Sequence, residues 1–219
     1  MITADTIQKN EQINVYIKQS DRALASLGYT EHSFAHVTKV ANFGKQLLLD
    51  LNYPHRTAEL AWIAGYMHDI GNVINRVDHA QSGAVMAFRI LDNLGADADE
   101  LAVIISAIGN HDESTAFPVN EVSAALILGD KTDVRRSRVR NSDLATFDIH
   151  DRVNYAVEDA KTYLNEAHTA LILELKIDTE ISPVMGYFEI FLDRMLLCRK
   201  AAEKLSLEFE LVINGQRIL

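Results

Sequence analysis

Apolar residues recur with helical spacing along the first two thirds of the chain. Each segment places apolar side chains three or four residues apart, which is typical of an amphipathic helix. Glycines follow several of these segments and indicate where the helices end. The pattern predicts helices over residues 6–27, 33–51, 57–69, 79–94, 97–109 and 119–131. Six or more helices of this kind predict a compact helical bundle.

The pattern changes near residue 150. Residues 153–157 alternate weakly and contain two valines, which favours a strand. Residues 168–178 alternate more strongly, so we predict a second strand there. Four apolar residues would share one face of that strand: Leu171, Leu173, Leu175 and Ile177.

The end of the chain mixes helical and strand signals. Residues 183–205 return to helical spacing, and Pro183 suits a first helical turn. The last segment favours a strand with a tight turn at Asn214–Gly215. We therefore predict a mainly α protein, with a helical domain over residues 1–148 and a small α+β extension over residues 149–219.

Composition narrows the class of protein. Apolar residues make up 48% of the 219 residues, which is enough for a substantial core. No apolar run is long enough to cross a bilayer, and the first ten residues lack the features of a signal peptide. The single cysteine, Cys198, forms no intrachain disulfide and is predicted to be buried. We expect a cytoplasmic protein that does not associate with membranes.

Charge is distributed unevenly along the chain. The formal net charge of −10 argues against general nucleic-acid binding, yet residues 131–140 carry five basic side chains and one acidic one. This local patch favours a small anionic ligand. Lys131, Arg135 and Arg138 lie three or four residues apart, so we predict that they share a helix face and bind the anion. A second pair is expected to face solvent or the extension: Arg136 and Arg140.

Histidines and aspartates gather at the predicted helix ends. Four of the eight histidines lie at such ends or in first turns, and two are followed directly by an aspartate. Neighbouring helical residues point about 100° apart, so His68 and Asp69 can reach one metal only where their helix ends. Gly71 supplies that ending. The whole set is His36, His68–Asp69, His79, His111–Asp112 and Asp130.

This mixture of donors indicates the metal and the chemistry. Imidazoles and carboxylates together suit Fe, Mn, Co or Zn better than Mg or Ca. The second oxygen of Asp69 is free to bridge to another metal. Two metals roughly 3.5–4 Å apart can share a water, lower its pKa and direct it at phosphorus. Nearby basic side chains would neutralise charge on the phosphate oxygens. We therefore predict two divalent transition metals and a small phosphorylated substrate.

These segments together resemble the HD-domain metal-dependent phosphohydrolase superfamily. The resemblance covers about residues 20–140 and rests on five segments in order: HSFAHVTKVA, AGYMHDIGN, HAQSGA, IGNHDE and LGDKTD. It implies an all-helical domain, a metal centre and hydrolysis of phosphate esters or anhydrides. It further implies two ligand sets that share one aspartate. The first set is His36, His68, Asp69 and Asp130, and the second is Asp69, His79 and His111.

Two more residues are candidate metal ligands. His32 stands four residues before His36, so we predict that the two share a helix face, and Asp112 follows His111. Similar positions help hold a third metal in the cyclic-dinucleotide phosphodiesterases of the superfamily. Those enzymes carry a Gly-Tyr-Pro signature after the fourth site, and its absence here argues against a cyclic-dinucleotide substrate. The remaining histidines are predicted to be structural or solvated: His55, His150 and His168.

The predicted function is a metal-dependent phosphohydrolase in which a metal-bridging hydroxide attacks a phosphate ester or anhydride of a small molecule, with a nucleotide as one candidate. Asp69 and Lys131 are the predicted catalytic residues, with Lys131 stabilising the phosphate oxygens. One alternative is a di-iron oxygenase, which uses the same ligand set. Another is a non-catalytic, metal-stabilised binding protein. In either case the extension has an exposed strand edge that is a candidate surface for a homodimer.

Overall fold

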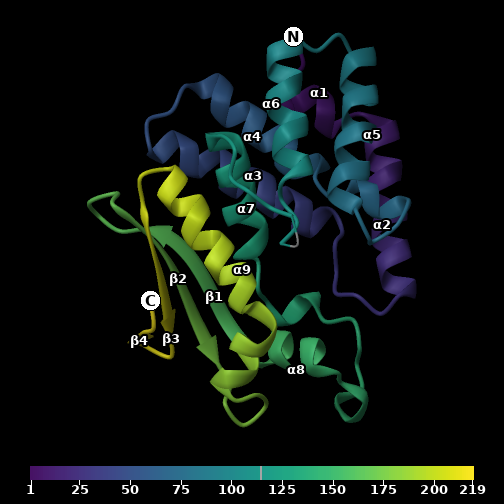
Figure 1. Cartoon of the computed structure of the whole chain (residues 1–219). Coiled ribbons are helices and arrows are strands. Elements are labelled where there is room, and N and C mark those ends of the chain that lie inside the picture. Colours follow the sequence, from purple (N-terminus) through teal and green to yellow (C-terminus); the bar gives the residue numbers. More distant parts are fainter. Residues whose placement is uncertain (114) are drawn as a thin grey trace.

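The computed structural model describes residues 1–113 and 115–219. Its first part is helical (Figure 1) and confirms all six predicted helical segments. The first of them is divided in two, because the Asn10 side chain accepts a hydrogen bond from the Ile13 N–H and caps a new helix. The elements are α1 (Ala4–Gln8), α2 (Glu11–Ser26), α3 (Phe34–Asp50), α4 (His55–Met67), η1 (Ile70–Val73), α5 (His79–Asn93), α6 (Ala98–Gly109) and α7 (Glu121–Lys131).

A small sheet and two helices follow. The sheet has the order β1-β2-β3-β4, in which β2 and β3 are parallel and the other neighbours are antiparallel. The mainly α fold with a small α+β extension is therefore confirmed. The remaining elements are η2 (Arg136–Arg138), η3 (Leu144–Thr146), α8 (Ile149–Ala156), β1 (Val157–Leu164), β2 (Ala170–Ile177), α9 (Val184–Lys204), β3 (Glu208–Ile213) and β4 (Gln216–Arg217).

The strand predicted over residues 153–157 is wrong for all but its last residue. Asp148 caps α8 by accepting a hydrogen bond from the Asp151 N–H at 2.8 Å, and residues 149–156 are helical. Val153 and Ala156 lie three residues apart and are both buried, so tertiary packing outweighs the strand preference of valine. The strand begins only at Val157.

The other predictions for this part are confirmed. The four apolar residues of β2 that were expected on one face are all buried. Helix α9 begins directly after Pro183. Asn214 and Gly215 both have positive φ, 51° and 80°, as a tight turn between β3 and β4 requires.

One hydrophobic core runs through the molecule. Helix α9 lies between the sheet and the helical part (Figure 1), where it packs against α7 on one side and against β2 and β3 on the other. Cys198 on α9 is buried as predicted, and burial raises the pKa of its thiol to about 12. Residues on both sides of the predicted boundary at 148/149 belong to this core, and the boundary itself stays a prediction.

Two surface features bear on partners. Strand β1 forms one edge of the sheet, carries exposed Glu158 and Asp159, and has an irregular register between Val157 and Asp159. Charges and bulges on an edge strand discourage pairing with another chain, and the predicted homodimer through this edge stays a prediction.

Among the described residues, no helix has both the length and the apolar character needed to cross a bilayer.

Candidate metal centre

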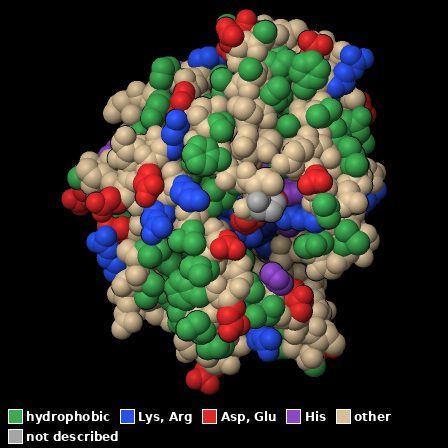
Figure 2. Space-filling view, in the orientation of Figure 1, with side chains coloured by type: hydrophobic (Ala, Val, Ile, Leu, Met, Phe, Trp, Pro, Cys, Tyr) green, Lys and Arg blue, Asp and Glu red, His purple; other side chains and the backbone are tan. Residues whose placement is uncertain are grey.

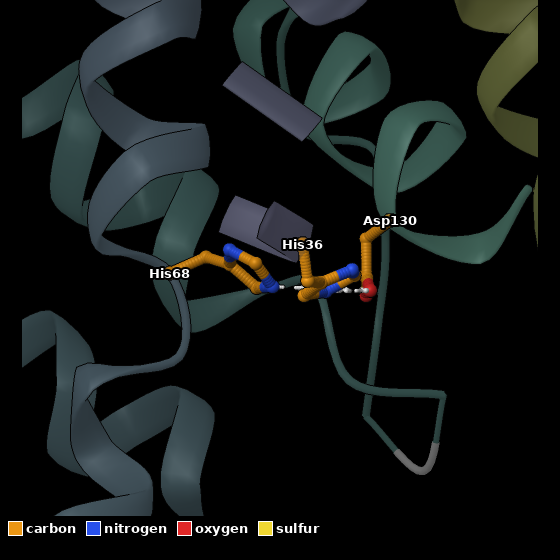
Figure 3. A group of neighbouring side chains, drawn as sticks. All are labelled: His36, His68 and Asp130. Carbon is orange, nitrogen blue, oxygen red and sulfur yellow. Dashed lines mark ion pairs between the residues drawn. The ribbon is translucent and has the colours of Figure 1, made fainter. Parts of the chain in front are cut away.

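The ends of several helices bring the predicted ligands together. His36 lies in the first turn of α3, His68 caps the end of α4, and Asp130 lies near the end of α7. Figure 3 shows these three side chains pointing toward one another from separate elements. Their ligand-type atoms lie within 4.8 Å of one another, and so do those of a second group formed by His68, Asp69 and His111.

A close approach of two segments positions His68 and Asp69. Helix α4 ends at Met67, and η1 then turns the chain against α5. A Cβ atom on Gly71 would lie 2.0 Å from the His79 carbonyl oxygen and 2.4 Å from the Gly83 nitrogen. Only glycine fits there, so the role of Gly71 is to let η1 pass α5 and bring His79 beside Asp69. The His79 Nε2 to Asp69 Oδ1 distance is 3.6 Å.

Every histidine of the centre is oriented through its outer ring nitrogen. A backbone carbonyl or a carboxylate lies at hydrogen-bond distance from each Nδ1, which assigns the proton to Nδ1 and leaves a lone pair on Nε2. These partners are Asp133 Oδ2 for His36 (2.8 Å), Gly65 O for His68 (2.8 Å), Arg76 O for His79 (3.0 Å) and Ile108 O for His111 (2.6 Å). The four Nε2 atoms therefore carry lone pairs that suit metal ligands, although that of His79 also lies 3.3 Å from Arg76 Nη1.

Asp133 supports the centre from behind His36, a role that the sequence did not reveal. The carboxylate is fully buried and also accepts hydrogen bonds from Lys39 Nζ (2.7 Å) and Arg135 Nε (3.0 Å). Burial alone would raise the pKa of Asp133, but the hydrogen bond with His36 and the positive charge of the Arg138 guanidinium hold that pKa well below its usual range. Asp133 is therefore ionised and fixes the His36 ring.

The inner atoms of the centre fit a cation. Within the described residues, His36 Nε2, His68 Nε2 and Asp69 Oδ2 are buried without a hydrogen-bond partner. His79 Nε2 lies 3.2 Å from His111 Nε2. Because both rings carry their proton on Nδ1, these two lone pairs face each other and repel unless a cation lies beside them. Arg76 Nη1, 3.3 Å from His79 Nε2, supplies part of that positive charge, and a bound metal ion would supply the rest. Buried nitrogen and oxygen atoms that carry lone pairs, lack hydrogen-bond partners and converge in this way fit divalent metal ions.

The charge states of most of these groups agree with this fit. His68 differs: burial would lower its pKa, but Asp69 outweighs burial and raises it, so a metal at His68 would displace a proton. Burial lowers the pKa of His79, and it lowers the pKa of His111 to about 3, so both rings are neutral. Burial would raise the pKa of Asp69 and Asp130, but the His68 imidazole beside Asp69 and the Lys131 ammonium beside Asp130 hold both pKa values well below the usual range. Neutral imidazoles and ionised carboxylates are the forms that bind metals.

A cavity of about 400 Å³ opens over the centre. Figure 2 shows histidine and basic side chains gathered in a hollow on this face of the molecule. Four basic residues contribute to the lining: Arg76, Lys131, Arg138 and Arg194. The part contributed by α8 and its cap is polar or acidic: Asp148, His150, Asp151 and Asn154. A volume of this size suits a small molecule.

The prediction that Lys131, Arg135 and Arg138 share one helix face is wrong. Helix α7 ends at Lys131, and Arg135 has extended backbone, with φ −158° and ψ 142°. Lys131 and Arg138 line the cavity, but Arg135 is absent from the lining. Arg135 instead donates a hydrogen bond from Nη2 to Glu31 Oε2 at 2.9 Å. The prediction fails because the helix ends at Lys131 and the chain is extended by Arg135.

The second predicted pair has structural contacts. Arg136 lies over the Tyr155 ring and donates a hydrogen bond to the Tyr155 carbonyl, which is a contact with the extension. Arg140 forms an ion pair with Asp21. These contacts join the segment after α7 to both parts of the molecule.

Lys131 has a defined place beside the centre. Its Nζ lies 2.6 Å from Asp130 Oδ2 and 3.2 Å from Glu113 Oε2. Burial would lower the pKa of Lys131, but these two carboxylates outweigh it and raise that pKa. A permanent positive charge therefore lies next to a predicted metal ligand and at the cavity surface.

The two additional ligand candidates differ in position. His32 lines the cavity, and its ring centroid lies 5.4 Å from that of His36. His32 precedes α3, so the prediction that it shares a helix face with His36 is wrong. Neither His32 nor Asp112 belongs to the two groups of potential metal ligands found among the described residues. The same is true of His79, whose Nε2 nevertheless lies 3.6 Å from Asp69 Oδ1. The roles of His32 and Asp112 as ligands stay predictions.

Several lining residues were missed by reasoning from the sequence. His150, expected to be structural or solvated, lines the cavity together with Asp148, Asp151 and Asn154. Arg194, on α9, is the lining residue that lies farthest along the sequence from the predicted ligands. No motif or spacing signals these residues, because each reaches the cavity only through the packing of the extension. Arg76 also lines the cavity, and its place three residues before the predicted ligand His79 is a sequence signal that could have identified it.

Comparison with known proteins agrees with the site. The model of the HD domain family matches residues 33–153, which are more than half of the chain. The chain belongs to the HD domain family. The matched residues include all six predicted metal ligands, so the resemblance drawn from the five segments is confirmed. The match ends before β1, and α9 with Arg194 lies outside it.

Two individual proteins are similar to the chain. An uncharacterised protein from Methanocaldococcus jannaschii is 25% identical over 158 residues, which are 62% of this chain and 61% of that protein. The chain thus spans less than two thirds of that relative. The crystal structure of a predicted HD superfamily hydrolase from an uncultured Thermotogales bacterium has 21% identity and a TM-score of 0.44, and the match covers 57% of this chain and 67% of that one.

Proposed function

We propose that this HD-domain protein is a metal-dependent phosphohydrolase that cleaves a phosphate ester or anhydride of a small molecule. The observation that carries the proposal is the set of buried Nε2 and carboxylate atoms without hydrogen-bond partners at the base of a cavity that is also lined by basic side chains. The donors fit transition metals, and the basic side chains suit a phosphate group.

The ligand residues divide around Asp69. His36 and His68 lie near its Oδ2, with Nε2 atoms at 3.7 and 3.2 Å, and Asp130 Oδ1 lies 3.3 and 3.8 Å from the same two nitrogens. His79 and His111 lie near Oδ1, with Nε2 atoms at 3.6 and 3.9 Å. Asp69 is therefore the residue that would join two metals. When bound, such metals lower the pKa of a coordinated water and polarise phosphoryl oxygens.

The remaining residues would bind and orient the substrate. Lys131 and Arg138 place positive charge at the cavity surface, where they would neutralise charge that develops on the phosphate oxygens. Asp133 keeps the His36 ring in the orientation that a ligand needs.

The test combines metal analysis with a substrate screen. Protein purified without chelator and without oxygen should contain about two transition-metal ions per chain, as a two-metal centre requires. It should release phosphate from a panel of phosphomonoesters and nucleotides equally well under argon and air. The Asp69→Ala variant should lose both metal and activity, whereas Asp50→Asn, on the exposed end of α3, should keep both.

Two results would contradict the proposal. One is full activity of Asp69→Ala. The other is fully metal-loaded protein that releases no phosphate from any member of the panel. Bound iron with turnover that requires oxygen would instead establish the oxygenase.

A further inference from the structure

Arg194 is a basic residue of the cavity that comes from outside the matched family segment. It lies on α9, and its side chain is 24% exposed and lines the cavity. Its Nε donates a hydrogen bond to Glu113 Oε1 at 2.8 Å, and its guanidinium carbon lies 4.4 Å from the centroid of the Phe191 ring. Among the described residues, its two terminal nitrogens have no hydrogen-bond partner.

Glu113 holds two cations side by side. One of its oxygens accepts from Arg194, and the other lies 3.2 Å from Lys131 Nζ. Burial would raise the pKa of Glu113, but Lys131 and Arg194 hold it well below its usual range, so the carboxylate is ionised. Lys131 also lies 2.6 Å from Asp130, so the two cations and the two carboxylates balance, and a metal ion held by Asp130 would leave net positive charge at this wall of the cavity. The geometry orients Arg194 and leaves its free N–H groups for a ligand.

We propose, on the basis of the proposed function, that Arg194 binds the phosphate of the substrate and restricts the substrate to terminal phosphates. A guanidinium that uses both terminal nitrogens takes two oxygens of the same phosphate. At least one further oxygen must face the metal-ligand residues. A phosphomonoester or a terminal phosphate of an anhydride has three non-bridging oxygens, but a phosphodiester has two. The substrate class is therefore a small molecule that carries a terminal phosphate.

Binding of inorganic phosphate to the metal-loaded full chain tests this inference without requiring turnover. Calorimetry should show Arg194→Ala binding phosphate about 10- to 100-fold more weakly than the native protein, as loss of charge-assisted hydrogen bonds implies. Arg194→Lys keeps the positive charge beside Glu113 but loses the paired terminal nitrogens of the guanidinium. Its phosphate affinity should therefore lie between those of the native protein and Arg194→Ala. Metal content should be unchanged in both variants. Arg199→Ala, an exposed arginine on the same helix, is the matched control and should bind phosphate normally.

Hydrolysis supplies a second readout. The ratio of kcat/KM for p-nitrophenyl phosphate over bis(p-nitrophenyl) phosphate should fall in Arg194→Ala, because the monoester loses more contacts than the diester. Loss of the preference in Arg194→Ala but not in Arg199→Ala would support Arg194 as the residue that selects terminal phosphates.

Three outcomes would overturn the inference. If native protein binds phosphate and Arg194→Ala binds it equally well with the same metal content, Arg194 is not a phosphate ligand, and the proposed function survives. If both Arg194 variants lose their metal, the residue only supports the centre. If metal-loaded native protein binds no phosphate, the inference fails together with the proposed function.

Discussion

The two walls of the cavity are built in different ways. The wall with the metal ligands comes from helix ends within residues 36–130, where each histidine is fixed by a short bond to a nearby carbonyl or to Asp133. A second wall comes from α8 and α9 of the extension, which reach the cavity by packing on η2 and α7. The first wall lies within the matched family segment. The second lies partly outside it, because the match includes Asp148, His150 and Asp151 but not Asn154 and Arg194. We infer that the first wall supplies the chemistry and the second the choice of substrate.

The largest expected effect tests how tightly the first wall is assembled. Gly71→Ala would place a Cβ atom 2.0 Å from the His79 carbonyl oxygen, so η1 and α5 must separate. We expect a loss of about 3 kcal/mol or more in the free energy of unfolding, together with loss of metal. Chemical denaturation and elemental analysis measure the two effects.

A second glycine provides the control for this substitution. A Cβ atom on Gly109 would meet only Ala84 Cβ at 3.5 Å, an ordinary contact. Gly109→Ala lies at the end of α6 and should be neutral or slightly stabilising. Equal stability of the two variants would show that the approach of η1 to α5 does not constrain the centre.

The next effect separates ligands from the residues that orient them. Asp133→Asn removes the charge that the His36 ring contacts at 2.8 Å. We expect metal affinity to fall about 10- to 100-fold, the usual consequence of losing such a supporting carboxylate. Competition with a chelator measures this affinity, and Asp50→Asn should match the native protein. An unchanged affinity would mean that His36 needs no support from Asp133.

The smallest effect concerns the second wall. Asp143 and Asp148 are both exposed and both cap short helices through one side-chain oxygen, but only Asp148 lines the cavity. Asparagine caps helices as well as aspartate does, so neither Asp→Asn change should alter stability much. Asp148→Asn removes a negative charge near the anion and should tighten inorganic phosphate binding about two-fold, as exposed charge pairs allow.

The paired variant makes that result interpretable. Asp143→Asn should leave phosphate binding unchanged, since its side chain is outside the cavity lining. If both variants tighten binding equally, the effect arises from net charge alone and the α8 wall does not contact the ligand.

Local pattern predicted the fold better than it predicted the basic patch. The helices and the β2 face follow from apolar spacing, which depends on neighbours a few residues away. The strand proposed at residues 153–157 failed because the cap at Asp148 and the burial of Val153 and Ala156 stabilise a helix there. The patch at 131–140 failed as a helix face because α7 stops at Lys131.

The sequence by itself determined the helices, the residues with ligand chemistry and their order, since these depend on residue type and short spacing. Tertiary structure alone decided which atoms converge, that Asp133 supports His36, and that Arg194 reaches the same cavity. Glu113 and Arg194 are 81 residues apart, and no local signal links them. Their contact exists only because the core that α9 shares with α7 brings them together, and packing over such separations has no periodicity in the sequence.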